Sequence, residues 1–405
     1  MADVKKVPYY KPQKGLFGSG LKKYQGSRGC IPLETQKGVS LDRLAPGEKP
    51  PPPLPKPAPK APSIPGRGSA SDPLPKTGQA MIKEPPEPPE AEVCEKPPHF
   101  DLQDVPIAMD NLGWKVSAKL ARIWFASPAH TYNDDPTSHQ PLNDGDVTLD
   151  WVLKFGNVRK KYEKLLSNDI YSERSARTAI DITKTFIKNL FLDRHSTLSL
   201  NTSGFIENLP KFHSDWQFQL SSISNFDTLE NFSPTDLTGA LANFNIYAAI
   251  GSVDISGEKY FRYEKSGNFY CINATGKITH IYVYVKDNYS FNGKQYLGHW
   301  NKHGVIISPG SLLTESSSPK RNSDIDIFAR AINKPVDTRR GLFGRLRDSD
   351  VYFPVYNADY NRWRQKHHRG RDFMIYSKPV RLRLNKPIHL ELGEICRLEP
   401  SDTLA

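Results

Sequence analysis

The most regular alternation of hydrophobic and polar residues in the chain lies within residues 277–308. Between Thr279 and Val285, β-branched residues occupy every second position, and His280, Tyr282 and Tyr284 fill the positions between them. A period of two built from β-branched and aromatic residues predicts a strand with both faces partly covered.

The residues after this strand predict turns, a loop and a returning strand. The pairs at 287–288 (Asp-Asn) and 292–293 (Asn-Gly) favour turns, and residues 303–308 again have the pattern of a strand. Residues 296–301 (Tyr-Leu-Gly-His-Trp-Asn) are predicted to form a loop between them, rich in groups that stack and hydrogen-bond. We expect function here, although the stretch matches no catalytic motif.

Three stretches in the first half of the chain have the spacing of amphipathic helices. The first covers residues 112–124 and is stopped by Ser127-Pro128. Thr148 is a suitable N-cap for the second, whose hydrophobic stripe extends to Leu166. The third is predicted from Ser172 to Phe191.

After residue 195 the period of the pattern changes from helical to two. Alternating stretches punctuated by Gly, Asn and Pro cover residues 216–220, 244–250, 268–272, 351–355, 372–376, 380–384 and 388–392. Helices followed by many strands predict an α+β fold, with N-terminal helices packed on a mainly antiparallel sheet.

The first 98 residues do not have the composition of a folded domain. Residues 1–40 are basic, and the segment from Pro46 to Pro98 holds 18 of the chain's 34 prolines. Because proline fixes φ and removes a backbone donor, we predict a disordered, extended tether; docking in an aromatic-lined groove is the alternative. The predicted organisation is a disordered arm (1–98), one globular α+β domain (99–397) and a disordered tail (398–405).

Net charge, cysteine positions and the absence of targeting signals indicate which partners and which cellular compartment to expect. The net charge of +11 favours anionic partners such as nucleic acid, an anionic membrane surface or an acidic protein. Cys30, Cys94, Cys271 and Cys396 are too far apart for a CxxC pair, so we predict reduced thiols and no disulfide framework. Neither a Sec signal peptide nor a transmembrane segment is visible, so we expect synthesis in the cytoplasm and, for export into target cells, a route without a Sec signal.

The strongest local charge bias lies in residues 339–386, where 13 Lys and Arg residues accompany four Asp residues. Its centre interleaves aromatic residues with cations, as sequence-tolerant nucleic-acid surfaces do. We predict that this block and the loop after Asp287 form one exposed basic-aromatic surface; a solvated helix or hairpin with paired arginines is the alternative. The predicted binding residues are Tyr289, Trp300, Asn301, Tyr356, Tyr360, Arg362, Trp363, Arg364, Arg369 and Arg371.

Two groups of residues combine imidazoles with a carboxylate, as a general base and its orienting partner do. Imidazole suits this role because its unperturbed pKa of about 6.5 permits proton transfer near neutrality. Ordinary packing or surface histidines are the alternative. The candidate catalytic residues are His299, His303 and Asp287 in one group, and His367, His368 and Asp372 in the other.

Several reaction classes lose support because their motifs are absent. The sequence contains no G-x-S-x-G elbow, P-loop, G-x-G-x-x-G or H-E-x-x-H motif. The polar loop 129–146 holds two histidines and several aspartates, but their spacing matches no metal site. We predict no metal and no cofactor.

Five segments carry a resemblance to a known group of proteins. They are GWKVSAKLARIWF (113–125), DWVLKF (150–155), DLTGALANF (236–244), VYVKDNYSFNGKQYLGHWN (283–301) and RGRDFMIYS (369–377). In this order they resemble an uncharacterised bacterial family often encoded beside type VI secretion genes, among candidate effectors. The resemblance covers residues 100–395 and implies delivery by a contact-dependent secretion machine, with an immunity protein for an antibacterial toxin. It implies no catalytic residues.

A second resemblance concerns the turn after the central strand. Asp287-Asn-Tyr289 followed by His299 is similar to the Asp-x-Tyr…His arrangement of colicin-M-like enzymes, which cleave the lipid-linked peptidoglycan precursor. This chain departs from that pattern at Ser290, where a second Asp is expected, and at Trp300, where Arg is expected.

Together these observations predict a secreted antibacterial effector of unknown target, and leave open whether it is an enzyme. One alternative is a non-catalytic binding module, an adaptor or cargo partner of the secretion apparatus. Another is a nucleic-acid-binding protein or nuclease. The expected partners are the secretion apparatus, a chaperone or immunity protein, and nucleic acid or another anionic ligand.

Overall fold

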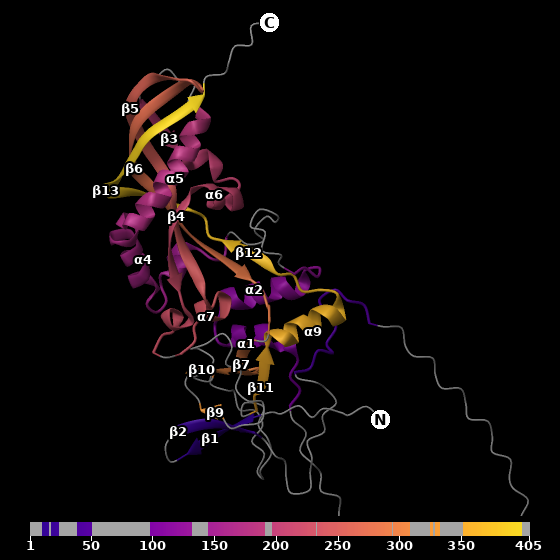
Figure 1. Cartoon of the computed structure of the whole chain (residues 1–405). Coiled ribbons are helices and arrows are strands. Elements are labelled where there is room, and N and C mark those ends of the chain that lie inside the picture. The colour runs from indigo at the N-terminus through magenta and orange to yellow at the C-terminus, as the bar shows by residue number, and fades with distance from the viewer. Residues whose placement is uncertain are drawn as a thin grey trace, which may run out of the picture.

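Helices pack on antiparallel sheets, so the predicted α+β class is confirmed (Figure 1). The computed structural model describes residues 10–15, 18–23, 39–50, 98–131, 145–190, 197–231, 233–293, 295–307, 325–326, 329–332 and 351–398. Nearly all of the predicted tail and most of the predicted arm therefore lie outside the described residues. Within these residues, no helix combines the length and apolarity that crossing a membrane requires.

Two long strands form the centre of the main sheet. β5 (Phe244–Glu264) and β6 (Gly267–Tyr289) pair antiparallel along their whole length, from Asn245 opposite Lys286 to Glu264 opposite Gly267. Shorter strands pair with the outer edge of β5, and the last two strands pair with the outer edge of β6. These are β3 (Thr197–Asn201) and β4 (Gln217–Ile223) on β5, and β12 (Phe373–Tyr376) and β13 (Val380–Leu398) on β6.

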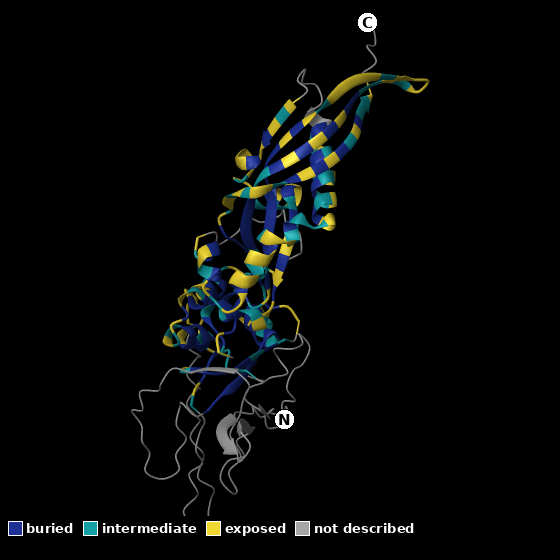
Figure 2. Cartoon of the chain, turned by 90° about the vertical axis from the view of Figure 1, so that its left-hand side faces the viewer, coloured by how far each residue is buried: buried dark blue, intermediate teal, exposed yellow. Residues whose placement is uncertain are grey.

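Helices cover the hydrophobic faces of this sheet. α5 packs against β13 and β4, and α4 packs against β4 (Figure 1). Residues 246–253 of β5 and 281–285 of β6 are buried on both faces. Toward the hairpin end of the sheet, buried and exposed residues alternate, as expected for half-covered strands (Figure 2). The helices are α1 (Val105–Asn111), α2 (Lys115–Ala126), α3 (Leu149–Val152), α4 (Val158–Ser167), α5 (Glu173–Leu190), α6 (Leu209–Trp216), α7 (Asp236–Ala240) and α9 (Asn357–His367).

A second sheet is built from strands that lie between β6 and β12 in the chain. Its strands lie in the order β10 (Ala329–Ile332), β8 (Gly304–Ile307), β7 (Tyr296–Asn301) and β11 (Phe353–Tyr356). The predicted loop at 296–301 is therefore wrong, because this segment is strand β7. Pairing with β8 and β11 on its two sides satisfies its backbone groups, and β11 comes from a distant part of the sequence. A third small sheet contains β1 (Tyr10–Gly15), β2 (Gly18–Lys23) and β9 (Ile325–Asp326).

The helix predicted after Thr148 is divided into α3 and α4. Gly156 lies between them with φ of +46°, a left-handed conformation that favours glycine. A Cβ at this position would lie 2.2 Å from the carbonyl oxygen of Asp227, so the chain can approach that backbone only through glycine. The hydrophobic stripe of these two helices was predicted correctly. The close contact between residue 156 and the backbone of Asp227, which interrupts the helix, has no signal in the local sequence pattern.

Residues 39–50, which were assigned to the disordered arm, pack on the folded body. Val39 and Ala45 are buried, with 2% and 3% of their surface exposed. The amide of Leu102 donates to the carbonyl of Ser40 at 2.8 Å. The ordered part of the protein therefore begins before the predicted boundary at residue 99.

Cys271 and Cys396 form a disulfide, so the prediction of reduced thiols is wrong for this pair. Cys271 on β6 lies directly opposite Cys396 on β13. Spacing along the sequence could not reveal the pair, because 125 positions separate the two residues. Cys30 and Cys94 lie outside the described residues. Disulfides of this kind persist in oxidising compartments.

Replacing both Cys271 and Cys396 by Ser should lower the free energy of unfolding by about 2–4 kcal/mol, because the cross-link restricts the unfolded chain. Urea denaturation of protein produced in an oxidising compartment measures this change. The same preparation should yield a cross-linked peptide holding both residues in non-reducing peptide mapping. Two freely alkylated cysteines at these positions would contradict the assignment.

Candidate functional site

The two segments expected to form the functional surface do lie together. β7 pairs with β11, and α9 begins directly after β11. The side-chain amide of Asn361 donates through Nδ2 to the backbone carbonyl of Phe291 at 2.7 Å. The rings of Phe291 and Tyr360 stack with centroids 3.7 Å apart. The segment after β6 and the helix of the basic block are therefore parts of one packed unit.

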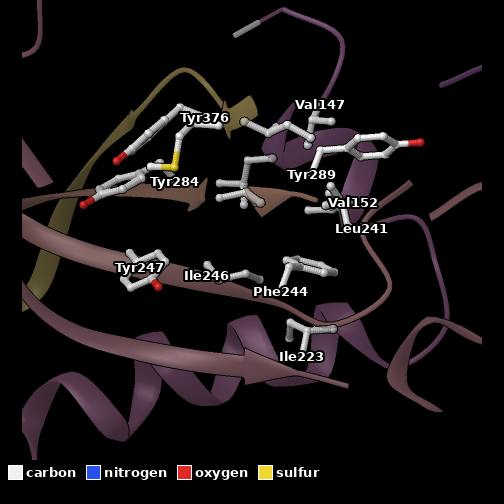
Figure 3. Close-up of a cluster of buried hydrophobic side chains, with 14 of the residues drawn as sticks. Val147, Val152, Ile223, Leu241, Phe244, Ile246, Tyr247, Tyr284, Tyr289 and Tyr376 are labelled. Carbon is white, nitrogen blue, oxygen red and sulfur yellow. The ribbon is translucent and has the colours of Figure 1, made fainter. Parts of the chain in front are cut away.

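The aromatic residues of these two segments are buried, so the prediction of an exposed basic-aromatic surface is wrong. Trp363 has no exposed surface and Tyr360 is 2% exposed. Both rings contact Trp124 of α2, which lies at the centre of this aromatic cluster. The other buried members of the predicted surface are Tyr289, Trp300, Asn301, Tyr356 and Arg364. Tyr289 also belongs to the buried cluster that contains Val152 and Leu241 (Figure 3).

The arginines of the block support this packing. Arg364 is buried, bonds the carboxylate of Asp372 at 2.5 Å and lies over the ring of Trp124. Arg362 pairs with Asp359, and Arg369 donates to the carbonyl of Ala126 at 2.8 Å. The amide of Arg371 donates to the carbonyl of Trp124. In the described part of the block, residues 351–386, Arg362 and Arg364 are therefore paired with acidic residues, as the alternative interpretation expects.

The predicted imidazole–carboxylate group of His367, His368 and Asp372 is not assembled. The ring nitrogens of His367 bond the carboxylate of Glu48 and the carbonyl of Leu41, at 2.7 and 2.8 Å. Asp372 instead accepts from the indole of Trp124 at 3.1 Å, in addition to Arg364. His368 is exposed and has a left-handed backbone conformation.

The predicted group of His299, His303 and Asp287 is likewise divided. His299 is 1% exposed, and its Nδ1 is hydrogen-bonded to the hydroxyl of Tyr296. Burial lowers the pKa of His299 to about 3, so the imidazole stays neutral. The amide of His303 donates to the side chain of Asn301 in the turn between β7 and β8. Of the six candidate catalytic residues, Asp287 is the one that lines a cavity described below.

Asp372→Ala should lower the free energy of unfolding by about 3–5 kcal/mol, because it leaves Arg364 buried without its carboxylate. Thermal or urea denaturation measures the loss. Asp372→Asn, which keeps an acceptor for Trp124, should lose less. A catalytic role without a structural one would leave both variants as stable as the parent.

A cavity of about 170 Å³ lies where the end of β6 meets α7, α9 and the second sheet. Its walls are mostly apolar, with the rings of Trp114 and Trp300 in edge-to-face contact at 6.4 Å. Trp114 precedes α2 and Trp300 belongs to β7. The polar lining residues are Thr238, Asp287, Asn288, Ser290, Gln295 and Asn357.

Asp287 has the electrostatic environment of a proton-transfer group. Burial raises its pKa to about 7, and the backbone amide of Asn288 and the charge of Lys286 offset only part of this rise. Asp287 as a residue keeps part of its surface exposed, and it lines the cavity. Near neutral pH the carboxyl group is therefore divided between its two protonation states. The pKa of neighbouring Tyr289 is raised, mainly by burial, so this phenol stays protonated.

Two amide oxygens on the cavity wall have no hydrogen-bond partner among the described residues: Oδ1 of Asn288 and Oδ1 of Asn357. Asn357 is 4% exposed, and its Nδ2 donates to the carbonyl of Asn292 at 2.7 Å. Because a carbonyl only accepts, this bond fixes the amide orientation and leaves the oxygen of Asn357 as a buried acceptor. Leaving such a group unpaired costs about 1–3 kcal/mol, and a ligand that donates an N–H or O–H would recover it.

Sequence reasoning found one part of this site and missed another. Asp287, Tyr289, Trp300 and Tyr360 were singled out, whereas Trp114, Asn357 and the α7 residues were not. Trp114 lay within the first predicted helix, and Asn357 within the basic block. No sequence signal joins them, because they come from separate elements that meet only in the fold.

Asp287→Asn should stabilise the protein at high pH. The folded-state pKa lies above the ordinary value of 3.8, so folding becomes less favourable as pH rises from about 4 to 7. Removing the charge should add about 2–4 kcal/mol to the free energy of unfolding at pH 8, but less than about 1 kcal/mol at pH 4. Urea denaturation at both pH values tests this. An equal effect at pH 4 and pH 8 would show that the carboxyl group titrates normally.

Comparison with known proteins gives one match. The model of a family of unknown function, DUF6402, matches residues 100–392. No curated protein and no solved structure matches the chain.

Proposed function

The chain belongs to the DUF6402 family of unknown function, and we propose that it is an antibacterial effector whose activity resides in the Asp287 cavity. One observation carries the proposal. The partly exposed residue Asp287 and the buried residue Asn357, whose amide oxygen has no hydrogen-bond partner among the described residues, line the same largely apolar cavity. Convergent polar groups in an apolar pocket are the usual features of a small-molecule site.

The chemistry proposed is general acid–base catalysis by Asp287. With a pKa of about 7, the carboxylate can take a proton from a substrate hydroxyl or a water, and the acid can return it to a leaving group. Trp114 and Trp300 supply apolar contact area, and Oδ1 of Asn357 accepts a hydrogen bond. The substrate class that fits is an amphipathic group with an apolar part and at least one N–H or O–H donor.

The effector part of the proposal rests on the segments that resemble the secretion-associated bacterial family, above all residues 283–301. This stretch contains Asp287 and Trp300, and the most extended of those segments contributes eight residues to the cavity wall. Delivery by a secretion machine and an immunity partner follow from that resemblance and are part of the proposal.

A non-catalytic binding module is a second candidate, favoured by a separate observation. At the far end of the β5–β6 hairpin, Phe261 is 53% exposed and Tyr263 is 73% exposed. Their rings stack with centroids 6.3 Å apart. Exposed aromatic pairs of this kind are enriched at protein interfaces. The nucleic-acid alternative has no comparable support, because the aromatic residues of the basic block are buried.

A growth assay tests the proposed function. The full chain is produced in the bacterial cytoplasm and, with an added signal peptide, in the periplasm, and it should stop growth in the compartment that holds its substrate. Asp287→Asn should restore viable counts by about 100-fold or more, because proton transfer contributes about 10²–10⁴-fold to a catalysed rate. Protein levels are compared by immunoblotting.

The matched control is Asp254→Asn. This variant makes the same chemical change on β5, where the carboxylate bonds the hydroxyl of Ser199 away from the cavity. It should remain fully toxic. Unaffected growth in both compartments would reject the effector proposal, and full toxicity of Asp287→Asn would reject the catalytic one. Loss of toxicity in a Phe261→Ser/Tyr263→Ser variant alone would instead favour the binding module.

A further inference from the structure

We propose that the Asp287 cavity binds a primary ammonium group carried on a short apolar stem, the chemistry of a lysyl side chain or of a free alkylamine. The inference rests on the proposed function and deepens it, since it names the ligand class of the same cavity. Binding of such a ligand can be measured without any effect on bacterial growth.

The charge on the cavity wall is negative. Among the described residues that line the cavity, Asp287 is acidic and none is Lys, Arg or His. The cation that precedes it on β6, Lys286, is not among the lining residues. Successive side chains of a strand point to opposite faces, and the charge of Lys286 also acts on His213 of α6. A positively charged ligand would therefore supply the counter-charge that this wall lacks.

The buried polar atoms left without a partner on this wall are hydrogen-bond acceptors. They are Oδ1 of Asn288 and Oδ1 of Asn357, and no buried side-chain N–H of a described lining residue is left in the same position. The indole of Trp300, for example, donates to the carbonyl of Leu297 at 3.0 Å. With the carboxylate of Asp287, the wall offers three acceptor groups.

A primary ammonium group matches this set, because it carries three N–H donors and no acceptor. A hydroxyl group has one O–H donor and adds acceptors that the wall does not need. A quaternary ammonium has no N–H for the amide oxygens, and an anionic group would be repelled by ionised Asp287. The donor count and the charge therefore select the same head group.

Aromatic rings form much of the remaining wall. Trp114 and Trp300 stand at 88° to each other with centroids 6.4 Å apart, and Phe291 and Tyr360 stack at 3.7 Å. The faces of such rings are partly negative and attract cations, while an apolar stem also packs against them. A cavity of about 150 Å³ holds benzene, so the 170 Å³ here suits a ring or a short chain of similar size.

Isothermal titration calorimetry of the full chain at pH 8 tests the assignment. At this pH Asp287 is mainly ionised and a primary amine is protonated. Benzylamine and benzyl alcohol share ring and stem but differ in charge and donor number. Benzylamine should bind about tenfold or more tightly, because charge-assisted hydrogen bonds are roughly twice as strong as neutral ones.

A third titration, with Nα-acetyl-lysine amide, distinguishes the two sources of the amine. Tighter binding than benzylamine would identify a lysyl side chain, and weaker binding a free alkylamine. If neither amine exceeds benzyl alcohol by this factor, or if no probe binds, the ammonium assignment is overturned.

Asp287→Asn should reduce the affinity for benzylamine about tenfold, to the level of benzyl alcohol, and leave the affinity for the alcohol unchanged. Asp254→Asn, the same chemical change outside the cavity, should bind both probes as the parent does. Undiminished benzylamine binding by Asp287→Asn would contradict the inference.

The ammonium assignment and the proposed function fail separately. Growth arrest that requires Asp287, without any preference for amines in the titrations, would overturn the ammonium assignment alone. A preference for amines that depends on Asp287, without growth arrest in either compartment, would support the assignment and reject the effector proposal.

Discussion

The backbone pairing between β5 and β6 is the constraint on which the other elements depend. Every further strand of the main sheet pairs with one of these two strands, and helices α4 and α5 pack on the faces that result. Asp287 and Asn288 lie near the end of β6, just before the chain leaves the sheet for β7. The cavity is therefore located where the regular pairing stops and irregular backbone begins, which is where proteins commonly place functional groups.

A second constraint is the aromatic cluster around Trp124. It joins α2, α9 and the segment after β6, and its indole is hydrogen-bonded to Asp372 while Arg364 lies over its ring. The residues that look most reactive in the sequence, the aromatic and cationic residues of the 356–372 block, are used to build this interface. Buried charge pairs of this type are costly to break, so we interpret them as contacts that stabilise the fold and not as a binding surface.

The sequence was sufficient for the fold class and for the strongest periodic elements. The alternation around Ile281 has a period of two and the stripe of α5 has a helical period, so each predicts its element without information from the rest of the chain. The division at Gly156, strand β7 and the Cys271–Cys396 bond were missed because each depends on a segment distant in the sequence. For the site, Asp287 stood out as a turn residue in a chemically rich stretch. The burial that raises its pKa comes from residues that are distant in the sequence, so no local sequence pattern predicts it.

The outer edge of β6 has a consequence for how the protein is made. β6 ends at Tyr289 and its partner β13 begins at Val380, so 91 positions (380 − 289) separate the two strands. At about 5–20 residues per second, the ribosome needs roughly 5–20 s to synthesise this interval. During that time the backbone groups along the outer edge of β6 lack their β13 partner. An unpaired strand edge can pair with another chain and so promotes aggregation. Cells that produce this chain must shield the nascent strand, and slower translation would lengthen its exposure.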